Sequence, residues 1–274
     1  MEKYNIKATW AFVGHLFLDS CKKERGTTHP EVLRPRIASL GGKDWHFMDP
    51  GTSLEKDPWW YGTDILDAVL TMNPKQEIGT HTFSHVVLDD EGCTRKMAIS
   101  QVKSHMELAQ KMKIKICSMV FPRNQIGFLN EMNRLGIKVY RGREENWYEQ
   151  APDNVKGLFH MLDQMLAISP PVYSFRNLRK VGGVLNIPAS MFLFPMDGIR
   201  ALVPSFSRKS KAFKGIKKAV DQEGIFHLWF HPFNLGSSDS LFEILEEVFR
   251  EIEAKQKTGA IENVTMGELY EKWK

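Results

Sequence analysis

The sequence contains little cysteine and has no long apolar segment, low-complexity tract or internal repeat. Its three cysteines, Cys21, Cys93 and Cys117, stand far apart without a CxxC spacing, so we expect neither a disulfide framework nor a thiolate metal site. No run comes near the length of about 18 apolar residues that a membrane-spanning helix needs. The absence of repeats and biased tracts argues against a solenoid and against a disordered chain. The start at Met1 leads straight into core-like sequence without a signal peptide, which favours a cytoplasmic location over secretion.

Neither sign of charge dominates the chain. Its 274 residues include 37 Lys and Arg against 33 Asp and Glu, a net charge of +4. This balance predicts no nucleic-acid partner, and we interpret the basic stretch at residues 208–218 as a solvated helix face. With 42% hydrophobic and 26% charged residues, the chain can form a substantial core, and we expect a single domain over residues 1–274.

Short apolar runs that end in Gly or Pro and a polar residue predict buried strands. They lie at residues 8–14, 77–81, 116–123, 184–188 and 225–232. Between them, apolar residues at helical spacing predict helices over residues 61–72, 94–112 and 239–256. Strands that alternate with helices are typical of parallel strands joined by right-handed crossovers, so the predicted fold class is α/β.

Two architectures fit this alternation, an open doubly wound sheet and a (β/α) barrel. The sequence has no GxGxxG turn, the usual dinucleotide site of an open sheet, and this favours the barrel. Residues 20–60 lack a regular pattern. We interpret them as a long loop on the active face, because unstructured loops of this length are usually functional or mobile.

The segment Gly79-Thr80-His81-Thr82-Phe83-Ser84-His85 carries the strongest local signal. Histidines four residues apart on a helical turn project from the same face and can share one ion. The pair begins where a predicted buried strand ends, which is the edge at which α/β barrels form active sites. The spacing alone is as compatible with structural histidines as with metal ligands.

A second pair of histidines lies in the predicted strand His227-Leu228-Trp229-Phe230-His231. Alternate residues of a strand share a face, so His227, Trp229 and His231 are expected to point together. Pro232 ends the strand and leaves His231 at its carboxyl end, where it could donate a proton to a leaving amine. A buried histidine bonded to the backbone is the alternative, and it is the favoured one for this residue taken alone.

Other candidate residues carry weaker signals. Arg123 follows a predicted strand, which suits a guanidinium that holds a carboxylate, although a surface arginine fits equally well. Aromatic residues at 59–61 and 147–148 could stack on sugars, but such clusters are more often part of a core. The remaining histidines show no partner spacing and receive no predicted role: His15, His29, His46, His105 and His160.

Together these sites resemble a known family. The order G-T-H-T-F-S-H at residues 79–85, F-P-R-N-Q at 121–125 and H-L-W-F-H-P at 227–232 is similar to that of the polysaccharide deacetylases, the NodB-homology or carbohydrate esterase 4 family. The start, residues 3–14, resembles the family's second strand and its lead-in. The resemblance therefore extends over nearly the whole chain, and its most specific element is the H-[ST]-x-x-H motif at 81–85.

The resemblance implies a distorted (β/α) barrel and a divalent metal, usually zinc, held by an aspartate and two histidines. The implied reaction removes acetyl groups from N-acetylated sugars of a polysaccharide or glycan and releases acetate and an amine. Carried over, the metal ligands are His81 and His85. Arg123 orients the catalytic carboxylate, and His231 is the general acid.

The chain departs from the family at two places. The family's Asp-Asp pair, which supplies the base and the third ligand, would precede Lys3. The resemblance therefore implies a barrel that is incomplete at the N-terminus, with an open edge at residues 7–13 through which a homo-oligomer could form. Arg123-Asn124-Gln125 stands where many members have Arg-x-Pro-Tyr. Two histidines without a carboxylate predict weak metal affinity, and the nearest candidates for a third ligand are His15, Asp49, Asp89 and Asp90.

Two other functions stay open. One is a non-catalytic carbohydrate-binding barrel, which would retain the family's substrate groove but lack its catalytic activity. A different metal hydrolase, such as a phosphoesterase, would need several carboxylates that bridge two metals, and the predicted strand ends offer none. In the deacetylase, we expect Trp147 and Trp229 to contact the glycan.

Overall fold

A computed structural model describes residues 1–89, 92–236 and 238–274. The chain divides into two compact units and passes between them several times. The first unit comprises Met1–Ile6, Gly142–Leu178 and Ile187–Asn263, and the second comprises Lys7–Arg141, Arg179–Asn186 and Val264–Lys274. The single domain predicted over residues 1–274 stays a prediction.

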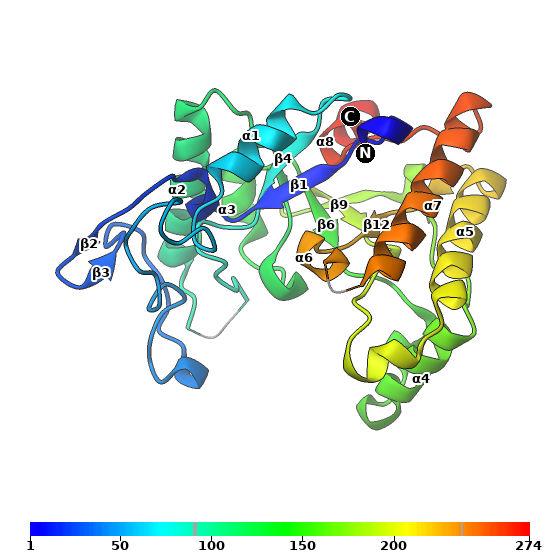
Figure 1. Cartoon of the computed structure of the whole chain (residues 1–274), viewed down its shortest axis with the longest axis horizontal. Coiled ribbons are helices and arrows are strands. Elements are labelled where there is room, and N and C mark those ends of the chain that lie inside the picture. Colours follow the sequence, from blue (N-terminus) through cyan, green and yellow to red (C-terminus); the bar gives the residue numbers. More distant parts are fainter. Residues whose placement is uncertain (90–91, 237) are drawn as a thin grey trace. The chain divides into compact units, whose positions relative to one another are not determined.

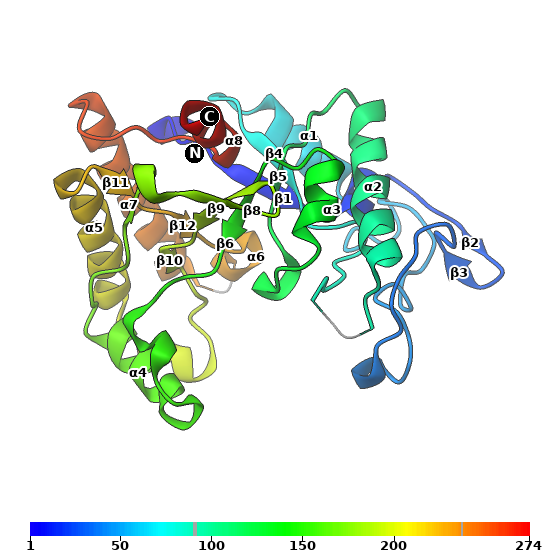
Figure 2. The ribbon, with the colours of Figure 1, turned by 180° about the vertical axis from the view of Figure 1, so that it is seen from behind.

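The second unit contains a six-stranded sheet in the order β1-β4-β5-β6-β9-β8 (Figures 1 and 2). Its strands are β1 (Thr9–Phe12), β4 (Glu77–Thr80), β5 (Ser118–Met119), β6 (Val139–Gly142), β9 (Val184–Pro188) and β8 (Arg179–Val181). The pairs β1–β4, β4–β5 and β5–β6 are parallel, whereas β8 pairs antiparallel with β9. The last residues of β6 and β9 belong to the ranges of the first unit.

This mostly parallel sheet confirms the predicted α/β class. Four of the apolar runs appear in it as β1, β4, β5 and β9. β1 and β8 are the outer strands, so the order of the described strands is open. The closed barrel stays a prediction.

The carboxyl ends of the parallel strands meet at one edge of the sheet. Phe12 pairs with Thr80, and Thr80 pairs with Met119, so β1, β4 and β5 end level with one another. A Cβ at Gly79 would come within 2.8 Å of the Ser118 hydroxyl, so the close approach of β4 to β5 needs glycine there. The segments after β4 and β5 therefore start side by side, as ligand-binding segments of α/β proteins do.

The described residues of the second unit form four α-helices: α1 (Thr63–Thr71), α2 (Arg95–Lys111), α3 (Leu129–Arg134) and α8 (Met266–Trp273). α1 and α2 confirm the helices predicted over 61–72 and 94–112. The Thr94 hydroxyl accepts a hydrogen bond from the Met97 backbone and caps α2, and Thr265 and Glu268 form a capping box at α8. The apolar faces of α1 and α2 pack with the strands in one core, which includes Leu66, Val69, Ile78, Val102 and Met119.

The first unit contains α4 (Asp153–Met165), α5 (Ser205–Asp221), α6 (Pro232–Leu235) and α7 (Asp239–Lys257), the last of which confirms the helix predicted over 239–256. α5 and α7 lie side by side in both views (Figures 1 and 2). Apolar residues of both helices form the core of this unit, including Ala212, Ile216, Leu241, Leu245 and Val248. Two short sheets complete it: β10 (Met191–Phe192) is parallel to β12 (Leu228–Trp229), and β7 (Tyr173–Ser174) is antiparallel to β11 (Gly224–Ile225).

The basic stretch in α5 is not a solvated face throughout. Arg208 is 0% exposed and donates hydrogen bonds to the carbonyl oxygens of Phe194 (2.7 Å) and Arg200 (2.6 Å). Lys211 is also buried and forms an ion pair with buried Asp163. The prediction was wrong for these two residues, because distant segments supply the acceptors that make a buried cation tolerable.

Residues 20–60 are largely irregular, as predicted. They contain the short hairpin of β2 (Lys23–Glu24) and β3 (Thr27–Thr28) and the 3-10 helix η3 (Ala38–Leu40). Across the described ranges of the chain, no helix combines the length and the apolar character that crossing a membrane requires.

Candidate metal centres

His81 and His85 lie on a tight turn directly after β4. The His81 backbone donates a hydrogen bond to the carbonyl oxygen of Phe12 (2.7 Å), which continues the pairing of β1 with β4. The chain then passes through Thr82 and His85 in left-handed conformations, with φ of 63° and 59°, and not through the helical turn that the spacing predicted. The Thr82 hydroxyl accepts a hydrogen bond from the Val86 backbone (3.0 Å), which stabilises the turn. The two imidazoles lie with their ring centroids 4.8 Å apart.

The orientation of the His81 ring is set by the backbone. Its Nδ1 lies 2.7 Å from the carbonyl oxygen of Val120. A carbonyl can only accept, so Nδ1 carries the proton, and Nε2 is the nitrogen that would bind a cation.

The backbone at this sheet edge is unusual. Left-handed residues other than glycine are uncommon and concentrate at functional sites, where the surrounding structure maintains the strain. The described residues between β4 and α2 and between β5 and α3 include five of them: Thr82, His85, Arg123, Asn124 and Phe128.

Arg123 lies close to the histidine pair. It belongs to the 3-10 helix η4 (Pro122–Asn124), directly after β5, and its side chain is exposed. Its guanidinium lies over the ring of Trp45, 5.3 Å from the centroid, and the same indole contacts His85 at 5.9 Å. The structure therefore brings three predicted site residues, His81, His85 and Arg123, to one edge of the sheet around Trp45.

The described residues supply two imidazoles to this site. Among residues 1–89, 92–236 and 238–274, no third His, Cys, Asp or Glu completes a ligand set with it. Of the candidates for a third ligand, Asp90 lies outside the described residues, and Asp89 is exposed. His15 and Asp49 belong to another cluster. A cation bound by two imidazoles would keep positions for water or substrate.

His231 and Trp229 lie in the first unit. His231 directly precedes α6, which begins at Pro232, and it follows the end of β12 at Trp229. The indole of Trp229 stacks on Phe192, with ring centroids 4.1 Å apart, and its Nε1 donates a hydrogen bond to Glu144 (3.0 Å). His231 contacts Trp229 at 5.5 Å, so these two side chains are neighbours, as their alternation predicted.

Trp147 begins the 3-10 helix η5 (Trp147–Gln150), also in the first unit. Trp147 is 53% exposed. Its Nε1 donates a hydrogen bond to Asp163 (2.9 Å), the buried residue that also forms an ion pair with Lys211. The indole is thus fixed by its polar edge and presents an apolar face to solvent, a combination that suits stacking on a sugar ring.

The predicted site residues are divided between the two units. His81, His85 and Arg123 belong to the second, whereas Trp147, Trp229 and His231 belong to the first. Their convergence on one cavity, and the role of each, stay predictions.

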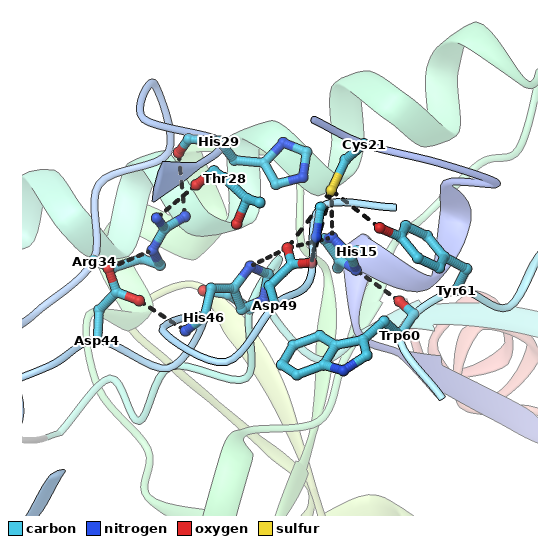
Figure 3. A network of polar contacts seen from close by, with 12 residues as sticks. His15, Cys21, Thr28, His29, Arg34, Asp44, His46, Asp49, Trp60 and Tyr61 are labelled. Carbon is cyan, nitrogen blue, oxygen red and sulfur yellow. Dashed lines mark hydrogen bonds and ion pairs between the residues drawn. The ribbon is translucent and has the colours of Figure 1, made fainter. Parts of the chain in front are cut away.

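The structure also assembles four side chains that the sequence did not connect: His15, Cys21, His29 and Asp49 (Figure 3). One potential ligand atom from each lies within 4.8 Å of those from the other three. The first ligand comes from the 3-10 helix η2 (Gly14–Phe17), and the other three come from the irregular stretch. This group, the His15 cluster, lies wholly in the second unit and could hold a metal ion.

The contacts within the His15 cluster are close. Nε2 of His15 lies 3.1 Å from Oδ2 of Asp49. The sulfur of Cys21 lies 3.7 Å from that nitrogen and 3.6 Å from that oxygen. Figure 3 shows the imidazole of His29 on the side of Cys21. Nε2 of His29 is buried and makes no hydrogen bond with any residue that the structure describes.

Surrounding groups hold these side chains in place. Nδ1 of His15 donates a hydrogen bond to the carbonyl oxygen of Trp60 (2.8 Å), which turns Nε2 toward Asp49. The hydroxyl of Tyr61 lies 3.3 Å from the sulfur of Cys21. The ligand atoms are therefore oriented from outside the cluster.

The environment shifts the pKa values of Asp49 and Cys21 in the cluster and that of the neighbouring His46. Burial opposes the ionisation of Asp49, but hydrogen bonds from His15 and from the Gly51 backbone outweigh it and hold the pKa of this carboxyl well below its usual range. Burial, together with the negative charge of Asp49, raises the pKa of the Cys21 thiol. Burial and the charge of His15 lower the pKa of His46 to about 3. A divalent cation among these groups would reverse the effect on the thiol and favour the thiolate.

The His15 cluster contacts the turn at residues 81–85. Phe83, in the middle of that turn, is buried, and its ring lies edge-on to His29 at 5.1 Å and to His15 at 6.0 Å. The His15 backbone also donates a hydrogen bond to the carbonyl oxygen of Phe83 (2.9 Å). The two groups of histidines are thus connected through one side chain and one backbone contact.

Sequence reasoning missed the His15 cluster because its ligands share no local pattern. Five, seven and nineteen residues separate them in chain order. The expectation that the cysteines form no thiolate metal site stays a prediction, but tertiary folding places Cys21 in a group that could hold a metal ion. A signal was present, since three of the nine histidines fall within residues 15–46 beside this cysteine.

No family model matches the chain, and a search of curated proteins finds no significant match. The resemblance to polysaccharide deacetylases therefore stands on the three sequence motifs alone.

Proposed function

We propose that the chain is a zinc-dependent hydrolase that removes N-acetyl groups from amino sugars of a polysaccharide or glycan, on the barrel fold of the polysaccharide deacetylases. The observation that carries the proposal is the contact between His81 and His85. Their rings lie 4.8 Å apart on a left-handed turn at the carboxyl end of a parallel strand. Active sites of α/β proteins form at this edge.

The donor set of this turn fits a zinc ion. His81 and His85 would hold it through imidazole nitrogens, which are ligands that zinc prefers. The hydrogen bond from His81 to Val120 supports this assignment, since ligating histidines usually donate their second N–H to such an acceptor. A bound divalent cation supplies a Lewis acid that polarises an amide carbonyl and acidifies water.

Two further side chains would complete the reaction. Arg123 would orient the catalytic carboxylate, because its planar fork can bind a carboxylate through two hydrogen bonds. His231 would donate a proton to the departing nitrogen, which is a poor leaving group unless it is protonated. The general acid must reach that nitrogen in the complex with substrate.

The glycan would contact indole side chains. Trp147 offers a half-exposed ring fixed by Asp163, and Trp229 is held by Phe192 and Glu144. Apolar faces of sugars stack on such rings, while the polar edge of the indole keeps its partner.

A carbohydrate-binding protein without catalysis is the second candidate. The observation that favours it is the exposed, hydrogen-bonded indole of Trp147, which serves binding as well as catalysis. Only the hydrolase releases acetate, so product analysis separates the two.

The test is acetate release from N-acetylglucosamine oligomers by the purified chain with added zinc. We expect acetate and new free amines in equal amounts. His85→Ala should lower the rate at least about 100-fold, because even outer partners of metal ligands are worth about 10–100-fold. His160→Gln is the matched control: this exposed histidine in α4 contacts Tyr148 and should leave the rate unchanged.

Two outcomes would contradict the hydrolase, and a third would contradict its assigned site. Binding of the oligomers without acetate release favours the second candidate. Hydrolysis of a phosphoester without acetate release favours a metal phosphoesterase. Acetate release that His85→Ala leaves unchanged excludes the histidine pair as its site.

A further inference from the structure

We propose that His15, Cys21, His29 and Asp49 form a structural zinc site that closes the irregular stretch at residues 20–60. It is separate from the histidine pair after β4, and it does not depend on the proposed deacetylase activity. The starting observation is that four potential ligand atoms, from two imidazoles, a thiol and a carboxylate, lie within 4.8 Å of one another.

The donor set selects zinc over magnesium or calcium. A thiolate and two imidazoles suit zinc, whereas the harder cations prefer oxygen ligands throughout. The thiolate of Cys21 and the carboxylate of Asp49 carry two negative charges, which a divalent ion neutralises. This compensation matters because Asp49 is 0% exposed, and a buried carboxylate requires a partner charge or a metal.

The spacing of the ligand atoms matches a zinc tetrahedron. With Zn–N and Zn–O bonds of about 2.0–2.1 Å and a Zn–S bond of about 2.3 Å, the N···O edge is about 3.4 Å and the edges to sulfur are about 3.6 Å. The N···O distance from His15 to Asp49 is 3.1 Å, and the sulfur of Cys21 lies 3.7 and 3.6 Å from those two atoms. Three of the ligands therefore already have the geometry of a coordinated set.

Both histidines are oriented from their far sides. Nδ1 of His15 donates to the carbonyl oxygen of Trp60 (2.8 Å), and Nδ1 of His29 lies 3.5 Å from the carboxylate of Glu31. In each ring this makes Nε2 the ligand atom. Backbone carbonyls and carboxylates behind the ring are the usual outer partners of zinc-bound histidines.

Hydrogen bonding alone satisfies this group poorly. Nε2 of His29 is buried and has no hydrogen bond to any described residue. The sulfur of Cys21 lies 3.6 and 3.8 Å from the two carboxylate oxygens of Asp49, at the length of a weak contact. Buried polar atoms are nearly always partnered in native proteins, and a zinc ion would supply the partner of His29 and strengthen the contacts of Cys21.

The site would compensate for missing regular structure. Between η2 and α1, a stretch that the structure describes throughout, only the β2–β3 hairpin and η3 are regular. An ion shared by His15 and Asp49 closes a long loop and thereby links folding of this stretch to metal binding. Since Phe83 packs against His15 and His29, the ion would also support the turn at residues 81–85.

Cobalt(II) spectroscopy of the full chain tests the site. A cysteine ligand gives a thiolate-to-cobalt charge-transfer band, which the pair of His81 and His85 cannot give because it contains no sulfur. Metal-free protein is titrated with cobalt chloride and then with zinc chloride. We expect the band to saturate at one cobalt per chain, together with the intense visible bands of tetrahedral cobalt, and we expect zinc to abolish both.

Two controls identify the ligand. Cys21→Ser should remove the band, whereas Cys117→Ser should retain it, because Cys117 lies beside Glu77 and outside the cluster. Alkylation of the wild-type chain by iodoacetamide avoids any effect of a variant on folding. Zinc should protect Cys21 from alkylation, and mass spectrometry locates the modified cysteine.

The proposal is overturned if the wild-type chain shows no thiolate band, if Cys21→Ser retains it, or if zinc leaves the alkylation of Cys21 unchanged. None of these measurements uses acetate release. A failed deacetylase assay would therefore not contradict the proposed structural zinc site. Likewise, failure of the cobalt and alkylation tests would not contradict the proposed deacetylase activity.

Discussion

The two groups of histidines in the second unit differ in sequence separation and in burial. His81 and His85 come from one turn and are half-buried. The His15 cluster draws its ligands from residues 15–49, and its carboxylate is fully buried. Two protein ligands keep coordination positions open for water and substrate, whereas four protein ligands fill a tetrahedral site. The histidine pair is therefore better suited to a catalytic metal ion, and the His15 cluster is better suited to a metal ion that stabilises the fold.

The largest difference should be in stability. A zinc ion present at about 1,000 times its Kd stabilises the folded chain by about 4 kcal/mol, or about 10 °C in Tm for a chain of this size. Calorimetry should show that Tm falls by this amount when zinc is chelated or when Cys21 is replaced in Cys21→Ser. His85→Ala should change Tm by no more than about 3 °C, within the usual range for a partly exposed side chain. If Cys21→Ser and the wild type have the same Tm in excess zinc, the cluster does not stabilise the chain through zinc.

The second difference should be in metal affinity. Four ligands should bind zinc at least about 100-fold more tightly than two, which is about 2.7 kcal/mol. Calorimetric titration of metal-free protein should therefore show a tight phase and a weak phase. The double variant His81→Ala/His85→Ala should lose only the weak phase. A single stoichiometric phase that this double variant abolishes would assign the tight site to the wrong histidines.

His105 extends the comparison to a histidine without a predicted metal. Its ring is fully buried, its Nδ1 lies 2.8 Å from the Thr80 hydroxyl, and burial lowers its pKa to about 3 from 6.5. The unfolded chain takes up a proton as the pH falls through 6.5, and the folded chain does not. The contribution to stability is therefore complete above that pH and declines below it, by about 2 kcal/mol at pH 5.

His105→Gln keeps a side chain that can bond to Thr80 but removes this titration. In urea denaturation, the variant should lose about 2 kcal/mol less than the wild type between pH 7 and pH 5. Equal losses in both proteins would contradict a neutral, buried His105.

The smallest effect should come from Trp147, the proposed stacking partner of the glycan. Trp147→Ala should raise KM for N-acetylglucosamine oligomers about fivefold, equal to about 1 kcal/mol of stacking, and leave kcat unchanged. Trp147→Phe keeps an aromatic face and should stay close to the wild type. A fall in kcat with constant KM would show that this indole acts on the reaction and not on binding.

Local patterns predicted the elements of this chain well where neighbouring residues determine the structure. The helices α1, α2 and α7 follow from apolar spacing, and the strands β1, β4, β5 and β9 follow from buried runs that end in Gly or Pro, whereas β6 was not predicted. The proximity of His81 to His85 was predicted for the same reason, although the connecting backbone is a left-handed turn and not a helical one.

Long-range partners could not be predicted. Arg208 was assigned to a solvated face because its acceptors, the carbonyl oxygens of Phe194 and Arg200, meet it only in the folded unit. The His15 cluster was missed because one ligand lies on a 3-10 helix and the other three lie in irregular backbone, without a shared period. Trp45, which connects Arg123 to His85, likewise stands alone in an irregular stretch.

The central claim is that the histidine pair serves catalysis while the His15 cluster holds a structural zinc ion. The double variant His81→Ala/His85→Ala tests it most directly, with acetate release and zinc content measured on the same sample. We predict that it retains one zinc ion per chain and releases no acetate above the background without protein. Acetate release at the wild-type rate, or a chain that has lost its tightly held zinc, would contradict this prediction.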